Sequence, residues 1–411
     1  MLKNIIRNLI TRGLVALINF LVLIFSARYL GVSTRGEISI FLLNIVVFQA
    51  INEIFTGYSI VHYLPRFDFR KLVAAGIIYT LVCCLLLNII FVFSGLTLPG
   101  YELAGFVVSL LVILHTFNCV LLLGKQQVKL FSLLSFMQPA LLLAGIFFFN
   151  FSLHVFTFKS YLYPLFFSFT VSWVVSSFFV LKLYRQSVRS NVFSLKSLLV
   201  NGLYFQLSAL MFVFANRFTY YLLPDVAQVG IYSAASALME SVLLFAAGIA
   251  PVLISKAANH QNRLEAASLT LSLAKVSTLV TVFFALLVFC IPGSFFVLVL
   301  GQPFYDVRSL MLLYAPGIVL VSFFSLMAAY LAATGQQRLV ALCYLPGFLH
   351  TALVGPLLVN YAGVEGAAIT AGISYLLMFI VLTSVFLHVT KLPFRRLLSV
   401  TPDIANIRAL F

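Results

Sequence analysis

The chain has 411 residues, of which 63% are hydrophobic and only 9% are charged. A soluble domain has about 45–50% apolar and about 25% charged residues, so this composition leaves too little polar surface for a water-soluble protein. The net charge of +15 comes from basic residues scattered in small groups between apolar stretches. Nucleic-acid binding requires a clustered basic face, so that function class is excluded and a membrane protein is predicted.

Apolar stretches long enough to cross a bilayer follow one another along the chain. A hydrocarbon core of about 30 Å requires roughly 20 apolar residues per helix, and helices satisfy their backbone hydrogen bonds inside lipid. We therefore predict an all-α polytopic membrane protein of about twelve transmembrane helices. The predicted spans are 13–34, 38–64, 72–95, 103–124, 130–150, 161–181, 198–223, 229–254, 276–300, 309–334, 339–360 and 364–387.

Two segments between or before these spans need an interpretation. The N-terminal stretch MLKNIIRNLITRG runs directly into the first span without a small-residue cleavage site, so we expect this helix to be retained. The longest connection, around 255–275, is expected to continue the neighbouring helices into the cytoplasm.

The distribution of basic residues predicts the orientation. With the N-terminus inside, 20 of the 25 Lys and Arg residues fall on the cytoplasmic side, four fall outside, and Arg217 lies within a span. Short cytoplasmic loops carry such an excess of positive charge. We therefore predict a multi-pass protein with both termini in the cytoplasm.

A weak internal repeat relates each span to the one six spans later. Gly124, after the fourth span, begins GKQQ, and Gly335, after the tenth, begins GQQR. Gly36 similarly matches Gly230, each followed three residues later by serine. Because six is an even number, the two halves have the same orientation in the membrane. This predicts two parallel six-helix lobes, 1–190 and 191–411.

Ionisable side chains inside a span cost about 2.5–3.5 kcal/mol each on insertion scales, so they are candidates for function. Glu53 lies near the middle of the second span and Glu240 near the middle of the eighth. Polar neighbours share a helical face with Glu53 by i, i+3, i+4 spacing. Arg217 lies in the outer half of the seventh span, and Arg28 lies near the outer end of the first span. The predicted substrate-binding residues are Arg28, Arg217, Glu53, Glu240, Asn52 and Gln49.

Each candidate also has a structural interpretation. Arg217 and Glu240 could form a buried ion pair between the seventh and eighth spans. Arg28 could extend to the outer headgroups. Small and polar stripes, such as Ser233 and Ser236 in the eighth span, are typical of helix packing.

Other polar residues inside the spans are expected to be structural or remain unassigned. His115 and His350 are interpreted as structural histidines in preference to proton relays. The seventh span has its own polar stripe, whose members share a face by helical spacing: Gln206, Asn216, Arg217 and Tyr220.

Sequence patterns of catalytic sites are absent. The chain has no GxxxxGK[ST] loop, no HExxH and no GxSxG. Its five cysteines lie in apolar spans without CxxC or zinc spacing, as small core residues do. We therefore expect no enzymatic activity, no metal site and no cofactor, and transport driven by an external gradient.

Four segments resemble polysaccharide exporters of the multidrug/oligosaccharidyl-lipid/polysaccharide (MOP) superfamily. ARYLGVSTRGEISIFLLNIV resembles the region after their first span, and VGIYSAASALMESVLLFAAGIAPVLISKAA their eighth span. YLAATGQQRLVAL resembles their tenth-to-eleventh junction, and NYAGVEGAAITAGISYLLMF the start of their last span. Together, in this order, they are similar to the O-antigen-flippase (Wzx) type.

The resemblance implies two six-helix lobes around a central cavity that opens alternately to each side. It implies a flippase in the cell inner membrane that moves an undecaprenyl-diphosphate-linked oligosaccharide during O-antigen and lipopolysaccharide synthesis. Arg28 and Arg217 would then bind the diphosphate, since a guanidinium matches its oxygens bidentately. Membrane lipids, a polysaccharide polymerase and chain-length proteins would be its partners.

Two other functions stay open. A cation-coupled multidrug exporter of the same superfamily would use an acidic cavity, for which Glu53 is the candidate. A polysaccharide polymerase or ligase has a similar number of spans, but that class carries a large periplasmic loop. The outer loops predicted here are short and nearly uncharged.

Overall fold

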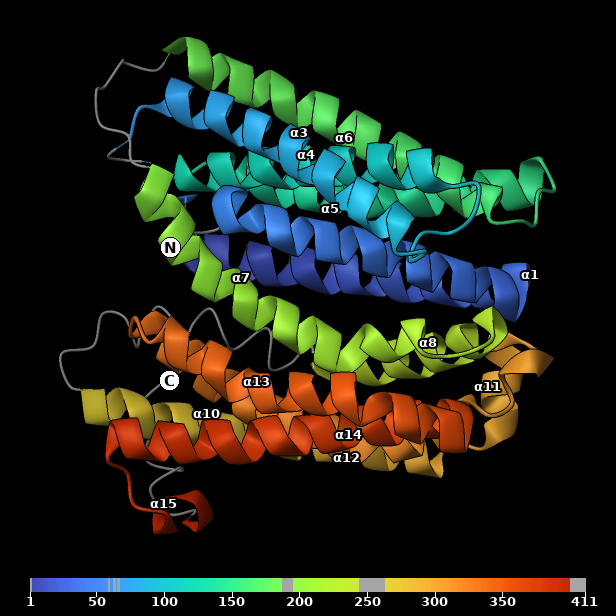
Figure 1. The fold of residues 1–411 in the computed structure, drawn as a ribbon, viewed down its shortest axis with the longest axis vertical. Coiled ribbons are helices and arrows are strands. Elements are labelled where there is room, and N and C mark those ends of the chain that lie inside the picture. Colours follow the sequence, from blue (N-terminus) through green and yellow to red (C-terminus); the bar gives the residue numbers. More distant parts are fainter. Residues whose placement is uncertain are drawn as a thin grey trace. The chain divides into compact units, whose positions relative to one another are not determined.

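The structure is a computed structural model that describes residues 2–57, 60, 61, 64, 67–186, 195–243 and 263–399 (Figure 1). All secondary structure in these residues is helical, which confirms the predicted all-α class. The main helices are α1 (Leu2–Thr56), α3 (Phe69–Phe93), α4 (Glu102–Gly124), α5 (Val128–Phe147), α6 (Lys159–Gln186), α7 (Leu195–Arg217), α8 (Val226–Glu240), α10 (Arg263–Cys290), α11 (Gly293–Leu300), α12 (Val307–Ala333), α13 (Gln337–Leu353), α14 (Gly355–Thr390) and α15 (Arg395–Leu398).

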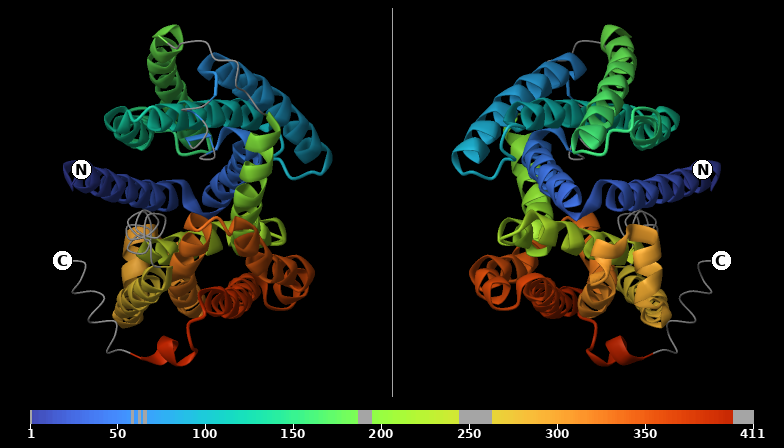
Figure 2. Two further views of the ribbon diagram at one scale, coloured as in Figure 1. Left: turned by 90° about the vertical axis from the view of Figure 1, so that its left-hand side faces the viewer. Right: turned by 90° about the vertical axis from the view of Figure 1, so that its right-hand side faces the viewer.

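The first helix contains two predicted spans. At Gly31 the backbone leaves the helical conformation, with φ of 80° and ψ of 176°. Only glycine adopts a positive φ of this kind without steric cost. The bend separates the two segments of α1, drawn in blue in Figure 2, and it lies between the centres of the predicted spans 13–34 and 38–64.

The described helices account for all twelve predicted spans. Nine of the described helices are long and apolar enough to cross a membrane. One of these nine, Gly13–Thr56, includes the bend at Gly31. The shorter α13 and the polar-containing α7 correspond to the predicted spans 339–360 and 198–223. The end of the predicted span 229–254 lies outside the described residues.

One predicted boundary was wrong. The span predicted at 276–300 ends too late, because α10 ends at Cys290 and a separate helix, α11, begins at Gly293. At its other end, α10 extends through charged residues to Arg263. This confirms the helical continuation expected for the part of 255–275 that is described. At the C-terminal end, α14 leaves the helical conformation at Gly363, where φ is 54°, so its second segment begins where the span 364–387 was predicted to begin.

The chain divides into two compact units, Met1–Gln206 and Leu207–Phe411, and the division falls within α7. The predicted lobe boundary at 190/191 lies outside the described residues, so it stays a prediction.

The helices of the two units pair in the same pattern. In the first unit α4 packs on α3 and α6, and α5 packs on α6. In the second unit α12 packs on α10 and α14, and α13 packs on α14. Each helix therefore corresponds to the one six spans later, as the predicted parallel repeat requires.

The structure corrects one register of this repeat. The turn after α4 has its left-handed residue at Gln126 (φ 60°), and the turn after α12 has it at Gly335 (φ 81°). Both turns use the same pattern of backbone hydrogen bonds to the preceding helix. Gln126 and not Gly124 is thus the counterpart of Gly335. The Gly36–Gly230 register agrees with the structure, since helices begin after Gly31 and after Asp225 at the same spacing.

Candidate functional site

Two polar clusters lie within the apolar helices, one in each unit. We call the first the Glu53 cluster, formed by Gln49, Glu53 and Gln206. We call the second the Glu240 cluster, formed by Asn216, Arg217, Glu240, Tyr314 and Tyr375.

In the Glu53 cluster, amide groups hold both oxygens of a half-buried carboxylate. Gln49, one helical turn earlier in α1, donates from Nε2 to Oε1 of Glu53 at 2.7 Å. Gln206 of α7 donates from Nε2 to the other oxygen, Oε2, at 3.2 Å. The donors are neutral, so these bonds leave the negative charge of the carboxylate uncompensated.

Glycines let α7 approach α1 closely enough for this bond. A Cβ atom at Gly202 would lie 1.8 Å from the backbone oxygen of Ile54, so no larger residue fits there. A Cβ atom at Gly57 would lie 3.0 Å from Nε2 of Gln206. Both glycines therefore position the amide of Gln206 beside Glu53.

Asn52 faces a different neighbour from Glu53. Its side chain is fully buried, and Nδ2 donates to the backbone oxygen of Phe48 at 2.9 Å and to Sγ of Cys84 on α3 at 3.6 Å. The structure thus places Asn52 between α1 and α3, outside the Glu53 cluster. Its substrate-binding role stays a prediction.

The Glu240 cluster is built on the hairpin between α7 and α8. α7 ends at Arg217, a 3₁₀ turn follows, and the side chain of Asp225 caps α8 by accepting from the backbone N–H of Ala227 at 3.0 Å. Arg217 donates from Nη2 to Oε2 of Glu240 at 2.9 Å. Asn216 donates from Nδ2 to Oε1 at 2.7 Å. The ion pair that the sequence allowed is therefore formed, and both oxygens of the carboxylate are bound.

Two buried tyrosines extend this cluster to α12 and α14. The hydroxyl of Tyr314 donates to Oδ1 of Asn216 at 2.5 Å and lies 2.9 Å from the hydroxyl of Tyr375. Each tyrosine is only 1% exposed. The ion pair itself is more accessible, since the Arg217 and Glu240 side chains are 32% and 23% exposed. The cluster thus has a buried, hydrogen-bonded base and a partly exposed charged end.

The remaining sequence candidates belong to neither cluster. Arg28 is exposed on the first segment of α1. His115 and His350 each lie beside a serine of a neighbouring helix, with Nδ1 to Oγ distances of 3.4 Å to Ser176 and 2.9 Å to Ser374. These contacts agree with structural roles for both histidines.

The small polar residues of α8 are buried and hydrogen-bonded. Ser233 donates to the backbone oxygen of Gly230 at 3.1 Å, and the Oγ of Ser236 lies 3.2 Å from the hydroxyl of Tyr220. Both serines are buried, which agrees with the packing interpretation of this stripe.

The charged end of the Glu240 cluster can bind an anion, while the Glu53 cluster offers a negative charge. Among the described residues, the bond to Glu240 uses one of the five N–H groups of the Arg217 guanidinium, and other N–H groups can contact a ligand. Within the described residues, no three His, Cys, Asp or Glu side chains are grouped so that they could hold a metal ion.

Comparison with solved structures gives full-length similarities. The lipid II flippase MurJ, in an inward closed conformation, matches with a TM-score of 0.69 and 13% identity, over 97% of this chain and 89% of MurJ. An inward-facing multidrug resistance MATE family transporter of the MOP superfamily matches with a TM-score of 0.65 and 15% identity, over 93% and 94% of the two chains. The chain has the MATE and MurJ fold.

A MATE structure in the bent conformation gives a similar result, with a TM-score of 0.64 and 14% identity over 95% of each chain. No family model matches the sequence, and no curated protein matches it. In this chain the MATE and MurJ fold carries the Glu53 cluster in its first unit and the Glu240 cluster in its second.

Proposed function

We propose that the chain is a flippase that moves an undecaprenyl-diphosphate-linked oligosaccharide across the cytoplasmic membrane for surface polysaccharide synthesis. The observation that carries the proposal is the similarity to the lipid II flippase MurJ over 97% of the chain. The four segments that resemble O-antigen flippases support the same substrate class. The positive-inside distribution supports an inner-membrane location with both termini in the cytoplasm.

Arg217 is the residue we assign to the diphosphate. Its guanidinium is partly exposed and held in place by Glu240, so its orientation is fixed before a ligand arrives. A fixed planar fork loses less side-chain entropy on binding phosphate oxygens than a flexible cation does. Arg28, exposed on α1, is a second candidate for the same role.

A cation-coupled multidrug exporter is the second candidate function, and one observation favours it. Among the described residues, the amides of Gln49 and Gln206 are the hydrogen-bond donors to Glu53, so its charge can attract a cationic ligand.

A deletion strain tests the proposal. We expect loss of surface polysaccharide and accumulation of the lipid-linked repeat unit in the inner leaflet, restored by the gene in trans. Unchanged polysaccharide with increased sensitivity to cationic drugs would instead establish the exporter. In a flippase, the polymerase and chain-length proteins that act on the flipped product would be its functional partners.

A further inference from the structure

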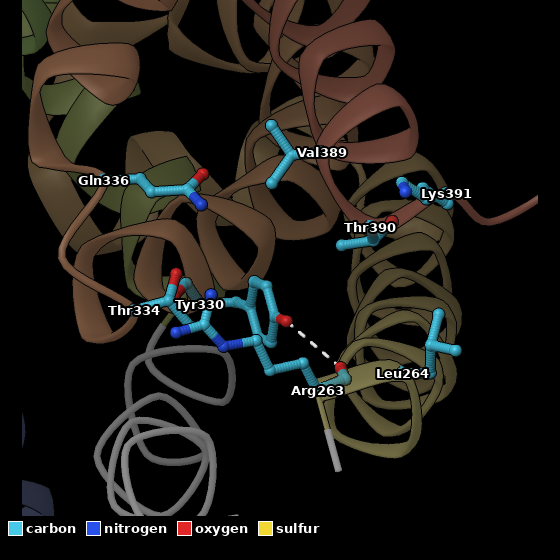
Figure 3. A pocket seen from close by; sticks show the side chains of 8 residues that line it. All are labelled: Arg263, Leu264, Tyr330, Thr334, Gln336, Val389, Thr390 and Lys391. Carbon is cyan, nitrogen blue, oxygen red and sulfur yellow. Dashed lines mark hydrogen bonds between the residues drawn. The ribbon is translucent and has the colours of Figure 1, made fainter. Parts of the chain in front are cut away.

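A cavity separate from both clusters lies where α10 begins and where α12 and α14 end. Its volume is ≈ 290 Å³, and all of its lining residues belong to the second unit. Figure 3 shows the side chains that enter it from these three helix ends. The predicted orientation places this end of the helices in the cytoplasm.

Among the described residues, two cations line the cavity and no carboxylate does. Arg263, at the start of α10, and Lys391, directly after α14, are both exposed. The hydroxyl of Tyr330 donates to the backbone oxygen of Arg263 at 3.1 Å, which fixes the start of α10 against α12. In Figure 3 the Arg263 side chain extends alongside Tyr330 toward Thr334. Two positive charges around one cavity favour an anionic ligand.

A neutral residue, Gln336, offers the ligand a hydrogen-bond acceptor. The side-chain oxygen Oε1 of Gln336 is buried and has no hydrogen-bond partner among the described residues. The amide of Gln336 is directed toward the cavity in Figure 3. A buried acceptor without a donor costs about 1–3 kcal/mol, so such a group usually binds a water or a ligand. The two cations could alternatively only stabilise the C-terminal carbonyls of α12 and α14, but that role leaves Gln336 unexplained.

We propose that this cavity binds a phosphate group that also carries a hydroxyl. Arg263 and Lys391 bind the phosphate oxygens, and Gln336 accepts a hydrogen bond from the hydroxyl. Two sources supply this chemistry, namely the glycerol-phosphate headgroup of an inner-leaflet phosphatidylglycerol and free hydrogen phosphate. The site does not depend on which substrate the protein transports.

Two double variants of the full chain separate the cavity from general surface charge. Arg263→Gln with Lys391→Gln removes both cavity cations. Arg338→Gln with Arg395→Gln removes two exposed arginines that do not line the cavity, from the same predicted side of the membrane. Gln336→Leu removes the orphan acceptor without changing charge. Melting temperatures in phosphatidylcholine nanodiscs first establish that all variants are folded.

Binding is then measured with two probes. Phosphatidylglycerol is added to the nanodiscs and retained lipid is counted by native mass spectrometry, while inorganic phosphate is titrated at constant ionic strength. We expect at least one probe to bind the wild type and the control variant equally, to bind the cavity variant about tenfold or more weakly, and to bind Gln336→Leu severalfold more weakly. Retained lipid identifies the headgroup as the source, and a response to phosphate alone identifies the free anion. Equal responses of the cavity and control variants to both probes would overturn the proposal.

Discussion

At the scale of single residues, Arg217 combines two roles that a substitution can separate. If it only partners Glu240, then Arg217→Ala leaves a carboxylate without its cation and lowers protein abundance. The free-energy cost is below the about 3–5 kcal/mol of a fully buried pair, because these side chains are 32% and 23% exposed. Adding Glu240→Gln would then restore abundance.

If Arg217 binds the diphosphate, as we propose, Arg217→Ala abolishes export and the double variant with Glu240→Gln does not recover it. Arg217→Lys should recover export only in part, since an ammonium lacks the planar fork. Immunoblots give abundance, and surface polysaccharide gives export. Wild-type export by Arg217→Ala at normal abundance would exclude both roles.

Tyr314 makes a second residue-scale prediction, which concerns stability. Tyr314→Phe removes the donor to Oδ1 of Asn216 and should destabilise the fold by about 1–3 kcal/mol. The purified variant should therefore melt at a lower temperature than the wild type. Tyr361→Phe is the matched control, because Tyr361 is 92% exposed. Equal melting temperatures for the two variants would refute the proposed role of the Asn216–Tyr314 bond.

At the scale of helices, the close approach of α7 to α1 depends on Gly202. Any Cβ atom at this position meets the backbone oxygen of Ile54, so the helices must separate and Gln206 must move away from Glu53. Gly202→Ala should therefore lower the melting temperature, consistent with about 1–3 kcal/mol for overpacking. Gly372→Ala is the control, because a Cβ atom at Gly372 meets nothing within 4 Å. A Gly202→Ala protein as stable as the control would contradict the observed packing.

The helices were largely predictable from sequence, and the cluster geometry only in part. Hydropathy located the spans because bilayer thickness sets their length. It misplaced the end of the span predicted at 276–300, because α10 ends at Cys290, just before Pro292. The Arg217–Glu240 pair was one of two interpretations that the sequence left open, since both residues lie within adjacent spans. The sequence did not identify Tyr314 and Tyr375 as members of the cluster, since a tyrosine in an apolar span acquires its partner only through tertiary packing. The polar stripe predicted on α7 does not form one site, because Gln206 contacts Glu53 while Asn216 contacts Glu240.

For the whole molecule, the topology predicted from charge is directly testable. Single cysteines at the exposed positions Asp225 and Asp306 should react with an impermeant thiol reagent in intact cells, and one at the exposed Arg395 should not. The native Cys290 is exposed, so the background protein carries Cys290→Ser. Labelling of Arg395→Cys in intact cells would contradict the predicted orientation. It would also contradict the cytoplasmic location of the phosphate cavity.

The central claim is that this fold moves a diphosphate-linked saccharide, and reconstitution tests it most directly. Proteoliposomes are loaded with a fluorescent undecaprenyl-diphosphate oligosaccharide, and the labelled lipid that reaches the outer leaflet is quantified under an imposed ion gradient. We expect wild-type protein to accelerate this movement, Arg217→Ala to abolish it at equal protein incorporation, and a cationic dye offered in its place not to be transported. Transport of the dye with no movement of the lipid-linked saccharide would contradict the account.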